Sequence, residues 1–200
     1  MSTMAFRRPG EWQAVSAGPV LQRAPGALQP PPLEARLPIN TRVPQEPRGG
    51  AEAPRWWWLG CHGGAGVTTL ERLLPGGKDA GRQWPDPRYG GPQGVLLVCR
   101  SNYAGLTAAS NAALQWASGY TPAHLALWGL VVVADAPGKL PKPLQAHLQR
   151  LQGTVQRLFR VGWVDAWRTT EPTFATASRD IAEIGLELQS RPWIEHRNGR

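Results

Sequence analysis

A short glycine-rich segment, HGGAGVTT at 62–69, carries the residue types in this sequence that are best suited to chemistry. Glycines let the backbone curl so that several N–H groups face one anion, and a helix that follows adds its positive N-terminal end. In a phosphate-binding loop a lysine contacts the phosphates and a Ser or Thr hydroxyl coordinates Mg²⁺. The residues predicted to contact a nucleotide are His62, Gly63, Gly64, Ala65, Gly66, Val67, Thr68 and Thr69, with Thr68 as the Mg²⁺ ligand.

The lysine of such a loop is missing, because Val67 stands in its place. A lysine beside a triphosphate also stabilises charge in the transition state, so its loss argues against hydrolysis. His62 is a partial substitute at best, since an ordinary imidazole is mostly neutral at pH 7. Four arginines could supply a cation from elsewhere, although nothing in the sequence places them at the loop: Arg72, Arg82, Arg88 and Arg100.

Two interpretations of the loop stay open. In the first, it binds ATP or ADP with Mg²⁺ but does not hydrolyse the nucleotide. In the second, it binds no cofactor and survives only as a tight turn between a strand and a helix. Both fit a backbone that keeps its glycines and threonines while losing the cation that phosphates need.

Asp135 is a candidate outside the loop, because it ends the apolar run WGLVVVAD at 128–135. In open α/β sheets, ligands bind at the carboxyl ends of the strands, where such an acid would lie. We therefore weigh a position for Asp135 beside the glycine-rich loop against a simpler role, in which it caps the turn before Pro137.

The apolar pattern predicts the elements that must position these residues. Short continuous apolar runs indicate buried strands, and apolar residues spaced 4, 3, 4 and 3 from 144 to 158 indicate an amphipathic helix. Residues 75–94 read as a turn-rich loop. The expected strands are 56–60, 95–99, 128–135 and 158–164, and the remaining expected helices are 67–74, 104–119 and 174–189.

Strands that alternate with helices at this spacing predict an α/β fold with a mostly parallel sheet of about four to five strands. Continuous apolar strands fit a sheet that is covered on both faces. If every right-handed crossover advances in one direction, the connecting helices cover only one face. The second face then needs the C-terminal helix, the N-terminal tail or another chain.

Composition divides the chain into three parts. Residues 1–54 are proline-rich and lack a sustained period, which predicts a disordered tail; 55–190 form the domain, and 191–200 form a basic C-terminal tail. The formal net charge of +8 permits DNA binding, although scattered arginines explain it equally well. Cys61 and Cys99 lack metal-ligand spacing, so we expect buried, reduced thiols.

The same composition bears on where the protein works. The N-terminus lacks the apolar region of a signal peptide. The longest apolar run, at 125–134, is too short to cross a bilayer. We therefore expect a cytoplasmic protein without a membrane span.

The segment HGGAGVTTL resembles the loop of the ParA/MinD branch of P-loop ATPases, which reads K-G-G-x-G-K-[ST]-[ST]. The glycines and threonines match, whereas His62 and Val67 replace the two lysines. The resemblance implies a P-loop fold in which RVGWVDAW ends near the nucleotide base. It thereby implies that Asp165 belongs to the nucleotide-binding site and that Trp163 and Trp167 form a platform for the base. The alternative for the two tryptophans is core packing.

The resemblance also sets the expected function. The family's switch region after the first helix is absent, which again argues against an ATPase. The patterns WWWLG, GGAGV, ADAPG and WVDAW resemble an uncharacterised actinobacterial family linked to mobile elements.

We therefore expect a degenerate ParA/MinD-like protein that acts as a binding or regulatory partner, in a mobile-element or DNA-partition setting. Its partner would be an unidentified protein or a second copy of the chain. Alternatives are a nucleotide-free protein–protein adaptor and a basic DNA-binding accessory protein.

Overall fold

The computed structural model describes residues 23–41, 54–86, 88 and 91–190. The strands are β1 (Trp56–Gly60), β2 (Gly77–Asp79), β3 (Gly94–Arg100), β4 (Ala126–Val133) and β5 (Leu158–Val161). The α-helices are α1 (Val67–Leu73), α2 (Tyr103–Ala117), α3 (Lys142–Gln152) and α4 (Arg179–Ser190). Short 3₁₀ helices within the described residues include η1 (Leu33–Ala35), η3 (Asp165–Arg168) and η4 (Phe174–Thr176).

The five strands form one sheet in the order β2-β1-β3-β4-β5, and every neighbouring pair is parallel. This confirms the predicted α/β class and parallel sheet. The chain moves from β1 to β2 on one side and then returns past β1 to β3 on the other. That reversal is the switch point of a doubly wound sheet, beside which ligands bind in such folds.

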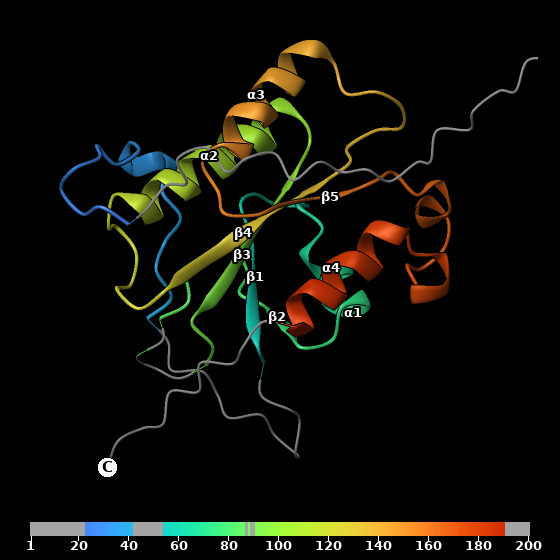
Figure 1. The fold of residues 1–200 in the computed structure, drawn as a ribbon, viewed down its shortest axis with the longest axis horizontal. Coiled ribbons are helices and arrows are strands. Elements are labelled where there is room, and N and C mark those ends of the chain that lie inside the picture. Colours follow the sequence, from blue (N-terminus) through green and yellow to red (C-terminus); the bar gives the residue numbers. More distant parts are fainter. Residues whose placement is uncertain (1–22, 42–53, 87, 89–90, 191–200) are drawn as a thin grey trace, which may run out of the picture.

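Each face of the sheet has its own pair of helices (Figure 1). Successive side chains of a strand point to opposite faces, so Leu97 joins the core under α2 and α3 whereas Leu96 joins the core under α1 and α4. The C-terminal helix α4 therefore lies beside α1, on the face opposite the α2 and α3 crossovers. This arrangement resolves how the second face is covered.

The interpretation of residues 1–54 as a tail is wrong for residues 23–41, which we call the strap. The strap lies against the α2 side of the domain, where Leu37 is buried in the same core as Leu59 of β1. Ile39 forms a parallel bridge with Trp84, in the segment that joins β2 to β3. Because α2 packs chiefly on β3 and β4, the strap and Trp84 complete the cover over β1.

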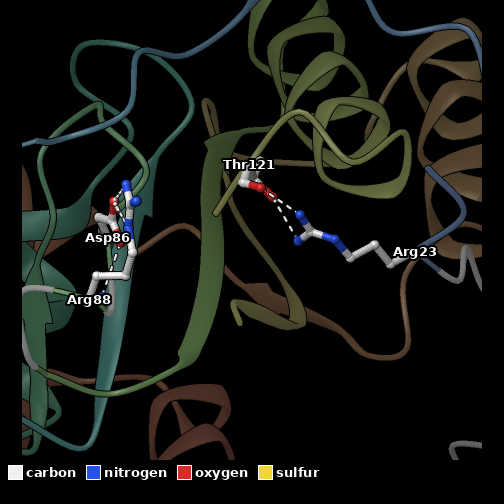
Figure 2. A network of polar contacts seen from close by, with 4 residues as sticks. All are labelled: Arg23, Asp86, Arg88 and Thr121. Carbon is white, nitrogen blue, oxygen red and sulfur yellow. Dashed lines mark hydrogen bonds and ion pairs between the residues drawn. The ribbon is translucent and has the colours of Figure 1, made fainter. Parts of the chain in front are cut away.

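Polar contacts hold both ends of this cover. Arg23 donates to the Thr121 hydroxyl at 3.1 Å, and Arg88 pairs with the buried carboxylate of Asp86 at 2.6 Å (Figure 2). The Arg23–Thr121 contact spans 98 positions and has no signature in the local sequence pattern, whereas Asp86 and Arg88 are only two residues apart. Residues 1–22 and 42–53 of the predicted tail, and the predicted basic tail 191–200, lie outside the described residues.

Several element boundaries differ from the sequence predictions. Strand β2 was missed, because its residues GKD carry no apolar side chain and it lies at the edge of the sheet. Helix α3 ends at Gln152, so Val155 is a buried loop residue and Leu158 begins β5. The last helix begins at Arg179 rather than 174, because a 3₁₀ turn precedes it.

Gly77 of β2 should be intolerant of any side chain. A Cβ there would lie 2.2 Å from the indole nitrogens of both Trp56 and Trp58, which are fully buried and contact each other edge to face. We expect Gly77→Ala to lower the free energy of unfolding by about 3 kcal/mol in urea titrations. Gly153→Ala is the matched control, because its Cβ would make only ordinary contacts; an equal loss in both variants would contradict this packing.

Asp86 should contribute stability that depends on pH. Hydrogen bonds from Arg88 lower the pKa of the Asp86 carboxyl below its ordinary value. Its stabilisation is therefore complete at neutral pH and is lost as the pH falls through that lowered pKa, below about pH 4. We expect Asp86→Asn to cost about 1–3 kcal/mol at pH 7 and much less near pH 2 in urea unfolding. A cost that is the same at both pH values would contradict this role.

Candidate functional site

The carboxyl ends of β1, β3 and β4 meet at the switch point and bring three segments together. These are the glycine-rich loop after β1, Arg100 to Asn102 at the end of β3, and Ala134 and Asp135 after β4. The main-chain ladder continues beyond the strands, since Ser101 donates its N–H to Val133 at 3.0 Å. Loop and strand ends therefore have defined positions relative to one another.

The loop backbone curls as the glycines predict. Gly64 and Gly66 have φ values of 74° and 105°, a left-handed conformation that favours glycine. Nothing lies within 4 Å of where a Cβ of Gly63 or Gly64 would be. Within the described part of the chain, no hydrogen bond uses the N–H groups of Gly63, Gly64 or Ala65. Gly63 and Gly64 are exposed, so their unused N–H groups lie beside open space, whereas Ala65 is buried.

Val67 occupies a core position instead of facing a ligand. It is 8% exposed and belongs to the cluster under α1 and α4. One of its methyl groups would lie 3.3 Å from a Cβ on Gly60, so it fills the inside of the turn between β1 and α1. The residue that the resemblance aligns with a phosphate-loop lysine therefore packs the loop against the sheet.

His62, at the second lysine position, braces the loop as a neutral ring. Its Nε2 accepts a hydrogen bond from the Arg100 N–H at 3.0 Å, while Nδ1 lies 2.8 Å from the Gly63 carbonyl oxygen. A ring that accepts at Nε2 and donates at Nδ1 is the neutral Nδ1–H tautomer. In this arrangement His62 joins β1 to β3 and does not act as a cation.

Arg100 is the cation that the structure places at the loop. Its Nε donates to the Gly64 carbonyl oxygen at 3.0 Å and its Nη1 to the Ala134 carbonyl oxygen at 2.9 Å. The guanidinium thus spans the gap between the loop and the end of β4. Of the other arginines considered, Arg72 pairs with Glu171, Arg88 pairs with Asp86, and Arg82 is exposed in the turn after β2. Arg100 differs from them because it is the last residue of β3 and contacts the loop.

Asp135 lies at the same edge of the sheet as the loop. It follows Ala134, whose carbonyl shares the Arg100 guanidinium with Gly64. The Asn102 amide donates to the Asp135 carboxylate at 3.0 Å. The main-chain N–H of Asp135 donates to the Ser101 hydroxyl at 3.0 Å. Asp135 is exposed, so its carboxylate is held beside the loop yet remains open to solvent.

The remaining predicted site residues are farther apart. Asp165 is exposed at the start of η3, after β5, and two strands separate β5 from β1. Trp167 packs on the core under α4 and donates to Thr176 at 3.1 Å, which favours core packing over a platform for a base. The Trp163 indole N–H is buried without an acceptor.

The surroundings of Thr68, the predicted Mg²⁺ ligand, contain no cluster of candidate metal ligands among the described residues. Thr68 is exposed and Thr69 is half-buried at the start of α1. Across the described ranges, no group of three or more His, Cys, Asp or Glu residues is arranged to hold a metal ion. Any metal at this loop would therefore depend on oxygens of a bound ligand.

The two cysteines are free and buried, as the sequence predicts. Cys61 and Cys99 directly follow the paired residues Gly60 and Val98 of β1 and β3. Burial raises the pKa of the Cys99 thiol to about 12 and raises that of Cys61 well above its ordinary value. Such thiols are poor nucleophiles, so their role is to pack beneath the loop.

Comparison with known protein families settles membership. The model of a family of unknown function, DUF6668, matches residues 55–183. The chain belongs to this family. The DUF6668 match contains the whole sheet and the glycine-rich loop, begins after the strap and ends inside α4. No curated protein and no solved structure matches the chain. Among its described helices, none is both long and apolar enough to cross a bilayer.

Asn102 should report on the electrostatics of this DUF6668 site. Its Oδ1 accepts the Gly105 N–H at 2.8 Å and caps α2, while its Nδ2 donates a hydrogen bond to the Asp135 carboxylate at 3.0 Å. Asn102→Asp keeps a capping oxygen but places two carboxylates together, whereas Asn102→Ser keeps a cap without charge.

We expect the aspartate variant to be less stable than the serine variant by about 1 kcal/mol at pH 7. The gap should close below about pH 4, where carboxylates are protonated. Thermal unfolding across this pH range measures it, and a pH-independent gap would contradict the arrangement.

Proposed function

We propose that the chain binds a phosphate-bearing ligand, a nucleotide in the first instance, at the tip of the loop without hydrolysing it. It would then act as a binding or regulatory partner. The observation that carries this proposal is the juxtaposition of unused N–H donors at Gly63 to Ala65 with the Arg100 guanidinium at a sheet switch point. Backbone donors and a guanidinium are complementary to a phosphate group.

The absence of turnover follows from the same residues. Val67 puts a methyl group where a lysine would reach the β- and γ-phosphates. Two N–H donors of Arg100 already form hydrogen bonds with carbonyl oxygens. Fewer of its donors are therefore left to stabilise the negative charge that develops in a transition state. A site of this kind stabilises a bound phosphate but not the reaction, which is also what a degenerate ParA/MinD-like protein would do.

One observation favours the alternative, a nucleotide-free adaptor. Both residues that replace family lysines have structural roles, since His62 braces β1 to β3 and Val67 packs the turn. A loop used only as a turn needs both roles and no ligand. The DNA-binding alternative gains less support, because Arg72, Arg157 and Arg179 form ion pairs with glutamates.

Thermal unfolding with ligand tests the binding proposal directly. Millimolar ATP, ADP or GTP with Mg²⁺ should raise the melting temperature, because a ligand at about 100 times its Kd adds about 2.7 kcal/mol of stability. Arg100→Gln should reduce the shift. Inorganic phosphate serves as a probe for the phosphate contact alone. No shift of the unaltered chain with any of these would exclude the site and leave the adaptor.

Restoring lysine at Val67 tests whether the loop is otherwise competent. Val67→Lys should lower the free energy of unfolding by about 1–3 kcal/mol, because a charged amine replaces a buried apolar side chain. The same variant should increase the rise in melting temperature caused by nucleotide. Val67→Met is the matched control, since it has similar length without charge. Equal shifts in the two variants would mean that the loop does not direct this side chain at phosphate.

A further inference from the structure

The strap is held mainly through its backbone. Gln115 accepts from the Leu37 N–H and donates to the Leu37 carbonyl, each at 2.9 Å. Trp84 donates its N–H to the Pro38 carbonyl and accepts from the Asn40 N–H, each at 2.8 Å. Three of the four residues 37–40 thus form hydrogen bonds through their main chain, as when an extended peptide is added to an existing strand edge.

Gln115 is oriented for this contact without help from the strap. It is 2% exposed, and its Oε1 also accepts from the Trp84 indole N–H at 3.1 Å. Its Nε2 also donates to the Tyr120 carbonyl at 3.2 Å. Because Trp84 and Tyr120 belong to the domain, each end of the amide keeps a partner if the strap leaves. The acceptor and donor that face Leu37 are therefore preformed.

The strap has few buried anchors. Leu37 is 8% exposed and Pro31 is buried, while the other strap residues are half-buried or exposed. Leu33, in the 3₁₀ helix η1, is 77% exposed. At the start of the strap, Arg23 donates to the hydroxyl and carbonyl of Thr121 (Figure 2). Two buried apolar residues, a set of main-chain hydrogen bonds and a terminal arginine are the features of a bound extended peptide.

We propose that Trp84, Gln115 and Thr121 form a peptide-recognition surface for an extended segment with a Leu-Pro pair. The strap is its resident ligand, and it can be exchanged for the strap of a second copy of the chain. The family match starts after the strap, at residue 55, so the surface belongs to the matched domain and its ligand does not. This proposal is independent of the phosphate site, which lies at the other end of α2.

Tethering explains why the surface is closed in the isolated chain. A segment joined to its site by a short linker experiences an effective concentration in the millimolar range. The strap joins β1 through residues 42–53, so it outcompetes a free copy at ordinary concentrations. Cutting the linker removes that advantage but leaves every contact in place, which makes exchange measurable.

The experiment uses the full chain with a specific protease site inserted between residues 42 and 53. After folding and cleavage, the N-terminal fragment should remain bound and co-elute with the rest of the chain. A fluorescent peptide of residues 23–41 should then replace it, with saturable anisotropy. The same peptide should bind the uncleaved chain at least about tenfold more weakly, because the tethered strap competes.

Substitutions in the peptide distinguish specific binding from nonspecific binding and leave the folded chain unaltered. Leu37→Asp in the peptide should weaken binding at least about tenfold, because its anchor is buried. Leu33→Asp is the matched control and should bind like the original peptide, since Leu33 is exposed. Loss of the fold on cleavage, failure of the peptide to enter, or equal binding of the Leu37 variant would overturn the proposal.

Discussion

Both faces of the sheet must be kept from water, because β3 and β4 carry apolar side chains in both directions. This constraint organises the chain. Three different solutions meet it: the crossover helices α2 and α3 cover one face, α1 and α4 cover the other, and the strap with Trp84 completes the cover over β1. A proline-rich segment can serve there because Gln115 and Trp84 satisfy its backbone polar groups.

The reversal of strand order at β1 has a second consequence. It leaves the carboxyl ends of β1 and β3 without a crossover helix between them, and the glycine-rich loop lies at that point. Arg100 and His62 then tie loop and strands together. The groups that hold the loop are the ones that would meet a phosphate, so rigidity and binding compete for the same donors. In the proposed function, that competition would be the physical reason why a phosphate is bound but not hydrolysed.

Much of the core could be predicted from the sequence, because continuous apolar runs need no knowledge of their partners. Strands β1 and β3 and helix α1 follow such runs closely. Strand β2 could not be predicted, since its residues GKD carry no apolar side chain and become a strand only by pairing with β1. The strap was hidden for a related reason: its contacts with Gln115 span 78 positions along the chain, and local composition carries no trace of them.

By itself, the sequence determined the α/β class, the turn-forming glycines and the lack of lysine in the loop, because each depends on local residue type. Only the tertiary structure decided what replaces the lysine. Val67 faces the core, His62 accepts a main-chain N–H, and Arg100 arrives from the neighbouring strand. These outcomes depend on strand order and register, which bring together residues more than 30 positions apart and which no local pattern encodes.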